Sequence, residues 1–239
     1  MEGAGPTAVL IHGFAGDVEY DWRATGLLSA LIRDHRRVVA LDCRGHGESG
    51  KPKDPKSYRG SRIAKDVGAV IDHTGSQAVD LIGYSMGSAI AARLLVERSN
   101  RFRCAILGGA GWPLDHREPD AERRRAIVSA LEGGATSATP AFARAFRTFA
   151  EKNGCDLQAL AAFQRSQGPP VDATALERVN VPVLVLRGER DGVARNPETL
   201  AGQLPQATLA KVPGDHITAP ASSAFRDAVL DFLARYSPS

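Results

Sequence analysis

The chain has 239 residues, of which 43% are hydrophobic and 24% are charged. This length fits one domain with an insertion or two small domains, and the composition is that of a folded globular protein rather than a disordered or collagenous one. Lysine and arginine number 30 and aspartate and glutamate 27, so the net charge is only +3. The longest basic run is Arg123–Arg125, so we expect no nucleic-acid partner.

The beginning of the chain lacks the features of a secretory signal. Residues Met1–Phe14 have no cationic stretch followed by a long apolar run. No stretch approaches the roughly 18 apolar residues that a membrane span needs, so we expect a cytoplasmic protein with no membrane span. The three cysteines, Cys43, Cys104 and Cys155, are odd in number and far apart. They indicate neither a disulfide framework nor a metal site.

Six short runs rich in valine, isoleucine and leucine recur along the chain. Most are nearly continuous rather than alternating, which is typical of strands buried on both faces of a parallel sheet. The runs are Ala8–Ile11, Val38–Leu41, Val79–Ile82, Cys104–Leu107, Val183–Leu186 and Thr208–Val212.

Longer stretches with helical patterns separate these runs. They are Trp22–Arg33, Arg59–His73, Met86–Arg98, Pro197–Leu204 and Ser222–Tyr236. The alternation predicts an α/β fold, with a doubly wound, mostly parallel sheet of about six strands and flanking helices. In such a sheet ligands bind beyond the carboxyl ends of the strands, so functional residues are expected just after each run.

One region interrupts the alternation of strands and helices. From about Trp112 to Ala175 the sequence has helical-looking pieces and no convincing strand run. We therefore predict a helical lid, residues 112–175, inserted into a core formed by residues 1–111 and 176–239.

Aromatic residues in the predicted lid allow two interpretations. Phe142, Phe146 and Phe149 recur at helical spacing. They could line an acyl pocket, but we favour packing of the lid onto the core. Trp112, at the start of the insertion, could equally line the pocket or fill the junction.

A possible nucleophile follows the third apolar run. Residues Gly83–Gly87 read Gly-Tyr-Ser-Met-Gly and lead directly into a helical stretch. This pattern exposes Ser85 on a tight strand-to-helix turn, and the two glycines let the strand and helix backbones pass close to it. The alternative is an ordinary turn with a capping serine. Placement after a buried strand favours the nucleophile.

A serine nucleophile needs a base, and the base needs an acid that orients it. His216 comes just after the sixth run, and Asp191 comes just after the fifth. Each could be an ordinary loop residue. Since the ends of parallel strands meet at one edge of the sheet, we instead predict that Ser85, Asp191 and His216 lie together and are catalytic.

The same chemistry needs N–H donors for the developing oxyanion. His12-Gly13-Phe14 follows the first run, and its glycine lets the next backbone N–H turn toward the serine. We predict that the backbone amides of Phe14 and Met86 are the donors, and that His12 is structural.

The chain resembles the α/β hydrolase fold family from Ala8 to about Tyr236. Five segments carry the resemblance, and Ser, Asp and His follow in the order typical of the family. They are the oxyanion loop His12–Phe14, the D-x-R-G-H-G-x-S turn Asp42–Ser49, the nucleophile elbow Gly83–Gly87, the acid loop Gly188–Asp191 and the histidine loop Gly214–His216. The turn at Asp42–Ser49 is interpreted as architectural, so we assign no catalytic role to His46.

Two departures from the family pattern stand out. Only Met1–Thr7 precede the first run, whereas the family commonly begins with an antiparallel hairpin. The sheet edge is then bare or covered by a partner, or the given start is late, and a homodimer is conceivable. The elbow also continues with Ser88 instead of a second glycine.

A second candidate for the catalytic acid is Asp115, at the start of the insertion, which is kept as an alternative to Asp191.

The resemblance implies a cofactor-independent serine hydrolase, with no metal, that acts on a small carboxylic ester or lactone through an acyl-enzyme. Relatives such as dehalogenases and epoxide hydrolases use an aspartate nucleophile, which Ser85 disfavours. Hydrolysis of a C–C bond or a thioester, and perhydrolase activity, remain open on the same residues. So does a non-catalytic protein that binds a small molecule in the same pocket, since fold alone does not fix function.

Overall fold

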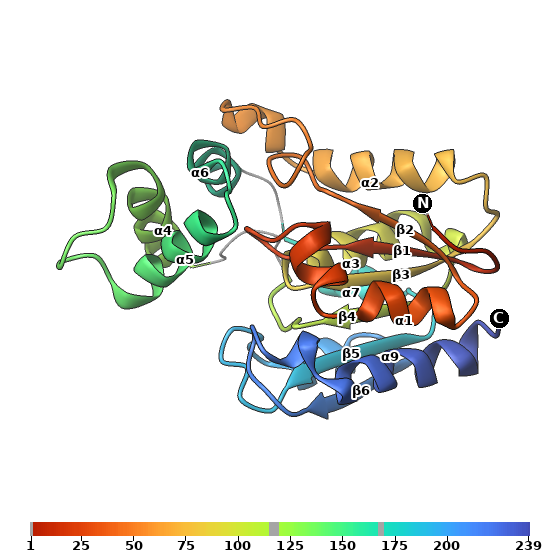
Figure 1. The fold of residues 1–239 in the computed structure, drawn as a ribbon. Helices are drawn as coiled ribbons and strands as arrows, with labels where there is room; N and C mark the ends of the chain where they lie inside the picture. Colours follow the sequence, from red (N-terminus) through yellow and green to blue (C-terminus); the bar gives the residue numbers. More distant parts are fainter. Residues whose placement is uncertain (1, 115–119, 167–169) are drawn as a thin grey trace.

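A computed structural model of the protein describes residues 2–114, 120–166 and 170–239. One sheet of six strands, paired in parallel throughout, has the order β2-β1-β3-β4-β5-β6 (Figure 1). The strands are β1 (Thr7–Ile11), β2 (Arg37–Leu41), β3 (Val79–Tyr84), β4 (Phe102–Gly108), β5 (Val183–Gly188) and β6 (Ala207–Val212). The predicted α/β class with a parallel sheet is confirmed.

Helices flank the sheet and fill the segment between β4 and β5. Those before β5 are α1 (Leu27–Arg33), α2 (Arg62–His73), α3 (Met86–Arg98), α4 (Ala121–Gly133), α5 (Ala141–Lys152), α6 (Leu157–Arg165) and α7 (Ala173–Leu176). α8 (Pro197–Gly202) and α9 (Ser223–Tyr236) follow β5 and β6. Short helical turns lie at η1 (Glu19–Arg23), η2 (Pro55–Tyr58), η3 (Ser99–Arg101) and η4 (Ala219–Ala221).

Alternate residues of β1 show how both faces of the sheet are covered. Ala8 and Leu10 belong to an apolar cluster formed with α1 and α9. Val9 and Ile11 belong to a second cluster, formed with α2 and α3 on the other face. All four side chains are fully buried. Burial on both faces explains why the strand sequences are continuously apolar.

The N-terminal residues lie against the edge strand β2. Glu2 and Val38 exchange two backbone hydrogen bonds, of 3.0 and 2.7 Å, in an isolated antiparallel bridge. The edge strand β2, which we expected to be bare or covered by a partner, is therefore paired at Val38 by the chain's own Glu2. The homodimer stays a prediction.

Two predicted helices begin at the wrong residue. The stretch Trp22–Arg33 is divided into η1 and α1, because Gly26 has φ +77°, a left-handed conformation that ends a right-handed helix. The stretch Arg59–His73 becomes helical only at α2, because Gly60 has φ +64°. In both cases the predicted helix included a glycine that the fold uses as a turn.

The segment between β4 and β5 forms a separate group of helices. α4, α5 and α6 enclose an apolar cluster, which includes Ile127, Leu131 and Leu160 and, from the body, the buried Ala15. Figure 1 shows these three helices beside the body of the molecule, at the side where the strands end. α7 returns to the body, where Leu176 joins the cluster of α2 and α3. That the segment acts as a lid stays a prediction.

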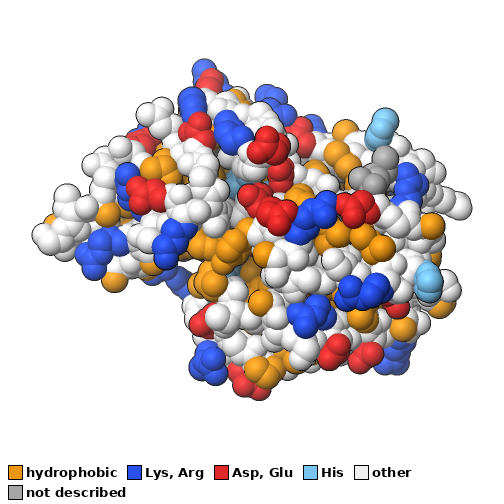
Figure 2. All heavy atoms as spheres, viewed as in Figure 1, with side chains coloured by type: hydrophobic (Ala, Val, Ile, Leu, Met, Phe, Trp, Pro, Cys, Tyr) orange, Lys and Arg blue, Asp and Glu red, His pale blue; other side chains and the backbone are white. Residues whose placement is uncertain are grey.

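The surface between these two parts is apolar. Figure 2 shows hydrophobic side chains gathered between the α4–α6 group and the sheet body, while charges of both signs are scattered over the rest of this face. Val193 and Ile217 are the large hydrophobic residues that are more than half exposed among those described. No helix within the described ranges has the length and apolar character needed to cross a bilayer.

Candidate active site

Ser85 occupies the tight turn between β3 and α3. Its φ of 51° and ψ of −113° are a combination that non-glycine residues rarely adopt. Its N–H donates to the carbonyl oxygen of Gly108, at 2.8 Å, which holds the turn against β4. A Cβ atom at Gly83 would lie 2.4 Å from the carbonyl oxygen of Gly87, and one at Gly87 would lie 1.9 Å from that of Ile11. Only glycine fits at either position.

Ser88 secures the same turn from inside α3. Its buried hydroxyl lies 2.9 Å from the carbonyl oxygen of Gly83 and 2.8 Å from that of Gly108. The first turn of α3 is thereby tied to the ends of β3 and β4. In the sequence Ser88 was noticed only as a departure from a family pattern, and the structure gives it a positioning contact.

The structure brings Ser85, His216 and Asp191 together from the ends of three strands. Nε2 of His216 lies 2.9 Å from Oγ of Ser85, and Nδ1 of His216 lies 2.8 Å from Oδ2 of Asp191. An imidazole that donates from Nδ1 to a carboxylate has Nε2 free to accept the serine proton. The arrangement can therefore activate the serine hydroxyl as a nucleophile.

The surroundings of Asp191 favour its ionised form. Oδ1 accepts the amide N–H groups of Val193 and Ala194, each at 2.9 Å. Burial raises the pKa of Asp191, but the hydrogen bond from His216, the His216 charge and the two amides lower it by more, so the net pKa is below its ordinary value. A charged carboxylate is what orients and stabilises a protonated imidazole.

Tyr84 supports the histidine from the other side. Its hydroxyl donates to the carbonyl oxygen of His216 at 2.5 Å, and the two ring centroids are 5.3 Å apart. Burial, followed by the charge of Asp191, raises the pKa of Tyr84 well above its ordinary value, so the phenol keeps its proton. The sequence analysis gave Tyr84 no role, because the G-x-S-x-G pattern does not specify the residue before the serine.

The backbone amides of Phe14 and Met86 stay the predicted donors to an anionic oxygen. Phe14 and Met86 line a cavity together with Ser85. The Gly13 N–H is already used, because it donates to Oδ2 of Asp21 at 2.6 Å, and the next amide along the loop is that of Phe14. Met86 is the first residue of α3, so its N–H has no partner within the helix.

Asp21 is a buried carboxyl group that the sequence did not reveal. It belongs to η1, is 9% exposed and lines the larger of two cavities at Ser85. Burial raises the pKa of Asp21, opposed by the charge of His12 and by the Gly13 hydrogen bond. In the sequence Asp21 belongs to a polar stretch, and only the fold turns it inward to hold the loop that contains Phe14.

The other two motif histidines lie in the interior. Nε2 of His12 accepts the N–H of Cys43 at 2.9 Å. His46 is 1% exposed, its Nε2 has no partner among the described residues, and burial lowers its pKa to about 3. His46 is therefore a neutral ring in the folded protein at neutral pH. The alternative acid Asp115 lies outside the described residues.

Two cavities meet at Ser85. The larger, of about 560 Å³, is lined by His216 and by the phenylalanines of α5, and the smaller, of about 160 Å³, by Met86 and Trp112. Phe142, Phe146 and Phe149 thus line the cavity. Phe146 and Phe149 also pack against Phe14 and Tyr20 of the body, with ring centroids 6.0 and 5.0 Å apart, so both interpretations of these residues hold. Within the described ranges, no group of three or more His, Cys, Asp or Glu side chains could hold a metal ion.

Curated proteins resemble less than half of the chain in sequence. Epoxide hydrolase 3 of Siraitia grosvenorii is 32% identical over 104 residues, which are 44% of this chain and 32% of that protein. Epoxide hydrolase B of Mycobacterium tuberculosis is 38% identical over 87 residues, or 36% of this chain and 24% of that protein. The chain therefore spans about a third or less of the length of these curated relatives.

Solved structures resemble it over nearly its whole length. The enol-lactonase from Burkholderia xenovorans LB400 has a TM-score of 0.79 at 23% identity, and a hydrolase from Pseudomonas aeruginosa PA01 has 0.73 at 26%. Each comparison covers 97% of this chain and 92% of the other. The model of the α/β hydrolase fold family matches residues 6–132, more than half of the sequence. The chain belongs to the α/β hydrolase fold family.

Proposed function

We propose that the protein is a serine hydrolase that cleaves a small carboxylic ester or lactone through an acyl-enzyme. The observation that carries the proposal is the continuous hydrogen-bonded path from Oγ of Ser85 through His216 to Asp191, with distances of 2.9 and 2.8 Å. Ser85 and His216, at one end of this path, line the larger cavity. The epoxide hydrolases among the relatives are disfavoured as a guide to the reaction, because the elbow residue here is a serine.

In this proposal the reaction has two halves. Oγ of Ser85 attacks the carbonyl carbon while its proton passes to Nε2 of His216, and Asp191 stabilises the imidazolium. The amides of Phe14 and Met86 hold the oxyanion. His216 then gives the proton to the leaving alcohol as its C–O bond breaks. A water, deprotonated by His216, releases the acid and restores Ser85.

A fluorophosphonate probe tests the nucleophile. We expect it to label Ser85, as located by peptide mass spectrometry, and we expect a burst with p-nitrophenyl acetate. Ser85→Ala should abolish both while the melting temperature stays at or above that of the parent, because the strained serine contributes little to stability. Ser129→Ala, an exposed serine on α4, is the control. Folded protein without labelling would favour a small-molecule binding protein instead.

The acid is tested by isosteric substitution. Asp191→Asn should lower kcat by about 10⁴-fold, because the neutral amide no longer fixes the imidazole tautomer. The same substitution at Asp115 should have a small effect. If Asp191→Asn is nearly silent and Asp115→Asn is crippling, the acid is Asp115.

A further inference from the structure

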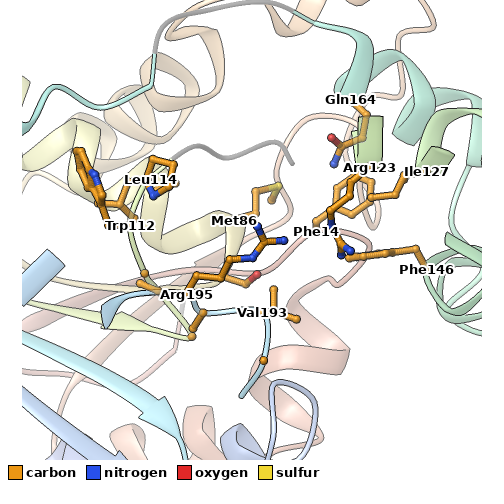
Figure 3. Close-up of a pocket in the computed structure, with 18 residues that line it drawn as sticks. Phe14, Met86, Trp112, Leu114, Arg123, Ile127, Phe146, Gln164, Val193 and Arg195 are labelled. Atoms are coloured by element: carbon orange, nitrogen blue, oxygen red, sulfur yellow. The ribbon is translucent and has the colours of Figure 1, made fainter. Parts of the chain in front are cut away.

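Among the described residues that line the larger cavity, Asp21 is the one with an acidic side chain. It is 9% exposed, and most of the other side chains in this lining are aromatic or aliphatic. Phe14 and Phe146 line both cavities, and Figure 3 shows them on the side of the smaller cavity that faces the α4–α6 group. A carboxyl group in such surroundings is costly to bury unless hydrogen bonds satisfy its oxygens.

The backbone satisfies only one oxygen of the Asp21 carboxyl group. Oδ2 accepts the N–H of Gly13 at 2.6 Å, whereas Oδ1 accepts no hydrogen bond from any residue in the described ranges. Unlike Nε2 of His46, which is sealed from solvent without a partner, Oδ1 of Asp21 stays accessible. Since Asp21 is nine-tenths buried and lines the larger cavity, Oδ1 is open toward that cavity.

The Asp21 carboxyl group lies close to the reacting groups. A Cβ atom at Gly13 would lie 3.4 Å from Oδ2 of Asp21 and 3.4 Å from Cβ of Ser85, so Gly13 alone separates the carboxyl group from the nucleophile. Of the two cavities at Ser85, His216 lines the one that Asp21 lines. In the proposed mechanism His216 gives a proton to the leaving alcohol, so that alcohol lies in the same cavity as Asp21.

The charges around the larger cavity favour a neutral hydrogen-bond donor over a cation. Lys152 and Arg123 also line it, so an ammonium group brought to Asp21 would be repelled by both. A hydroxyl group can donate to a carboxylate without adding charge. Burial raises the pKa of Asp21, but the Gly13 hydrogen bond and the charges of the neighbouring histidines favour its ionised form.

We infer that Asp21 is a substrate-binding residue whose Oδ1 accepts a hydrogen bond from a hydroxyl group on the leaving alcohol. The substrate class is then the monoester of a diol, because the alcohol part of such an ester keeps one free hydroxyl group. A hydrogen bond to a carboxylate is stronger than one between neutral groups, and an alkyl group in the same place would leave Oδ1 without a donor. This inference rests on the proposed hydrolase function.

Matched butyrate esters test the preference for a hydroxyl group. The 2-hydroxyethyl and 3-hydroxypropyl esters are compared with the propyl and butyl esters, in which a methyl group replaces the hydroxyl group. In a pH-stat assay we expect kcat/KM to favour at least one hydroxy ester over its alkyl counterpart about tenfold. The methyl ether of the favoured alcohol can accept a hydrogen bond but cannot donate one, so its ester should be cleaved about tenfold less efficiently than the hydroxy ester.

Asp21→Asn changes the free acceptor into a donor. The amide oxygen can still accept the Gly13 N–H, so the NH₂ group takes the place of Oδ1. Hydroxy and methoxy oxygens can both accept from this group, so we expect the kcat/KM ratio of these two esters to fall to within about twofold. Glu19→Gln, which removes an exposed carboxylate from the same helical turn, should leave the ratios unchanged. Thermal melting and fluorophosphonate labelling show whether Asp21→Asn is folded with a reactive Ser85.

Equal kcat/KM values for the hydroxy and alkyl esters would reject the role of Asp21 and leave the hydrolase standing. An unchanged ratio of hydroxy to methoxy ester in Asp21→Asn would also overturn it. If that variant does not fold, the comparison of esters in the parent protein still decides. If no ester is cleaved, fluorophosphonate labelling decides the hydrolase by itself, and NMR titration of Ser85→Ala with the same esters decides the role of Asp21. It stands if a hydroxy ester binds about tenfold more tightly than its alkyl counterpart, and it fails if their affinities are equal.

Discussion

Ser85 shows how a strained residue is held by its neighbours. Its N–H is bonded to β4, and its carbonyl oxygen accepts the N–H of Ser88 at 3.0 Å. A backbone in this region costs on the order of 1–3 kcal/mol, and these contacts hold it in place. The G-x-S-x-G pattern predicted the strain correctly because glycine spacing reports a local steric requirement. The contact with β4 comes from Gly108, which lies far from Ser85 in the sequence, so no local pattern indicated it.

His46 gives a prediction for acid stability. Its pKa is about 3 in the folded protein, against an ordinary value of 6.5. Between these values the unfolded chain binds a proton at this position and the folded chain does not, so stability is present above pH 6.5 and is lost as pH falls toward 3. One such group changes the unfolding free energy by at most about 1.4 kcal/mol per pH unit.

We therefore expect His46→Phe to make the unfolding free energy less dependent on pH between 6 and 4, by about 1 kcal/mol per unit. Phenylalanine keeps the ring contacts with Phe14 and Phe163. Urea unfolding at several pH values measures the slope. His73→Gln, at an exposed position, should leave the slope as it is. A slope unchanged in His46→Phe would mean that His46 is protonated while folded.

At the scale of elements, the approach of α3 to β1 depends on Gly87. A methyl group there would meet the Ile11 carbonyl oxygen at 1.9 Å, and the atom in its way is backbone. We expect Gly87→Ala to lower the unfolding free energy by about 3 kcal/mol or more, because helix and strand must separate. Gly202→Ala in α8, where the added Cβ meets nothing within 4 Å, should change it by less than about 1 kcal/mol. Urea denaturation measures both, and equal effects would contradict the close approach.

The strands and helices also show what the spacing of apolar residues in the sequence can and cannot predict. All six strands were predicted, because a strand buried on both faces needs an unbroken apolar run. Helix starts were less well predicted, since apolar spacing says nothing about the sign of φ at Gly26. Phe142, Phe146 and Phe149 fit a helix face, but spacing cannot distinguish a face against protein from a face against a cavity.

At the scale of the whole molecule, a buried ion network joins distant parts of the chain. Arg36, which is 0% exposed, bonds Oδ2 of Asp80 at 2.9 Å and the carbonyl oxygen of Ser237 at 2.8 Å. Asp80, also 0% exposed, accepts from Arg103 as well. This network lies at the amino end of the sheet, opposite Ser85, and connects β3 and β4 with the residue that follows α9.

We expect Arg36→Met to destabilise the protein by about 3–5 kcal/mol, because it leaves a carboxylate buried with one partner fewer. The matched control is Arg44→Met. Arg44 pairs with Asp66 at 2.8 Å, but both side chains are about one-third exposed, so the loss should be at most about 1 kcal/mol. Chemical denaturation compares the two, and similar losses would show that the buried network is not a major source of stability.

The sequence by itself determined the order of strands along the chain, the elbow at Ser85 and the candidates Asp191 and His216, because strand burial and tight turns leave local patterns. Only the tertiary structure decided the distances among these three side chains, the inward position of Asp21 and the two cavities at Ser85. Those features depend on how segments far apart in the sequence pack against one another, and no local pattern of residues encodes that packing.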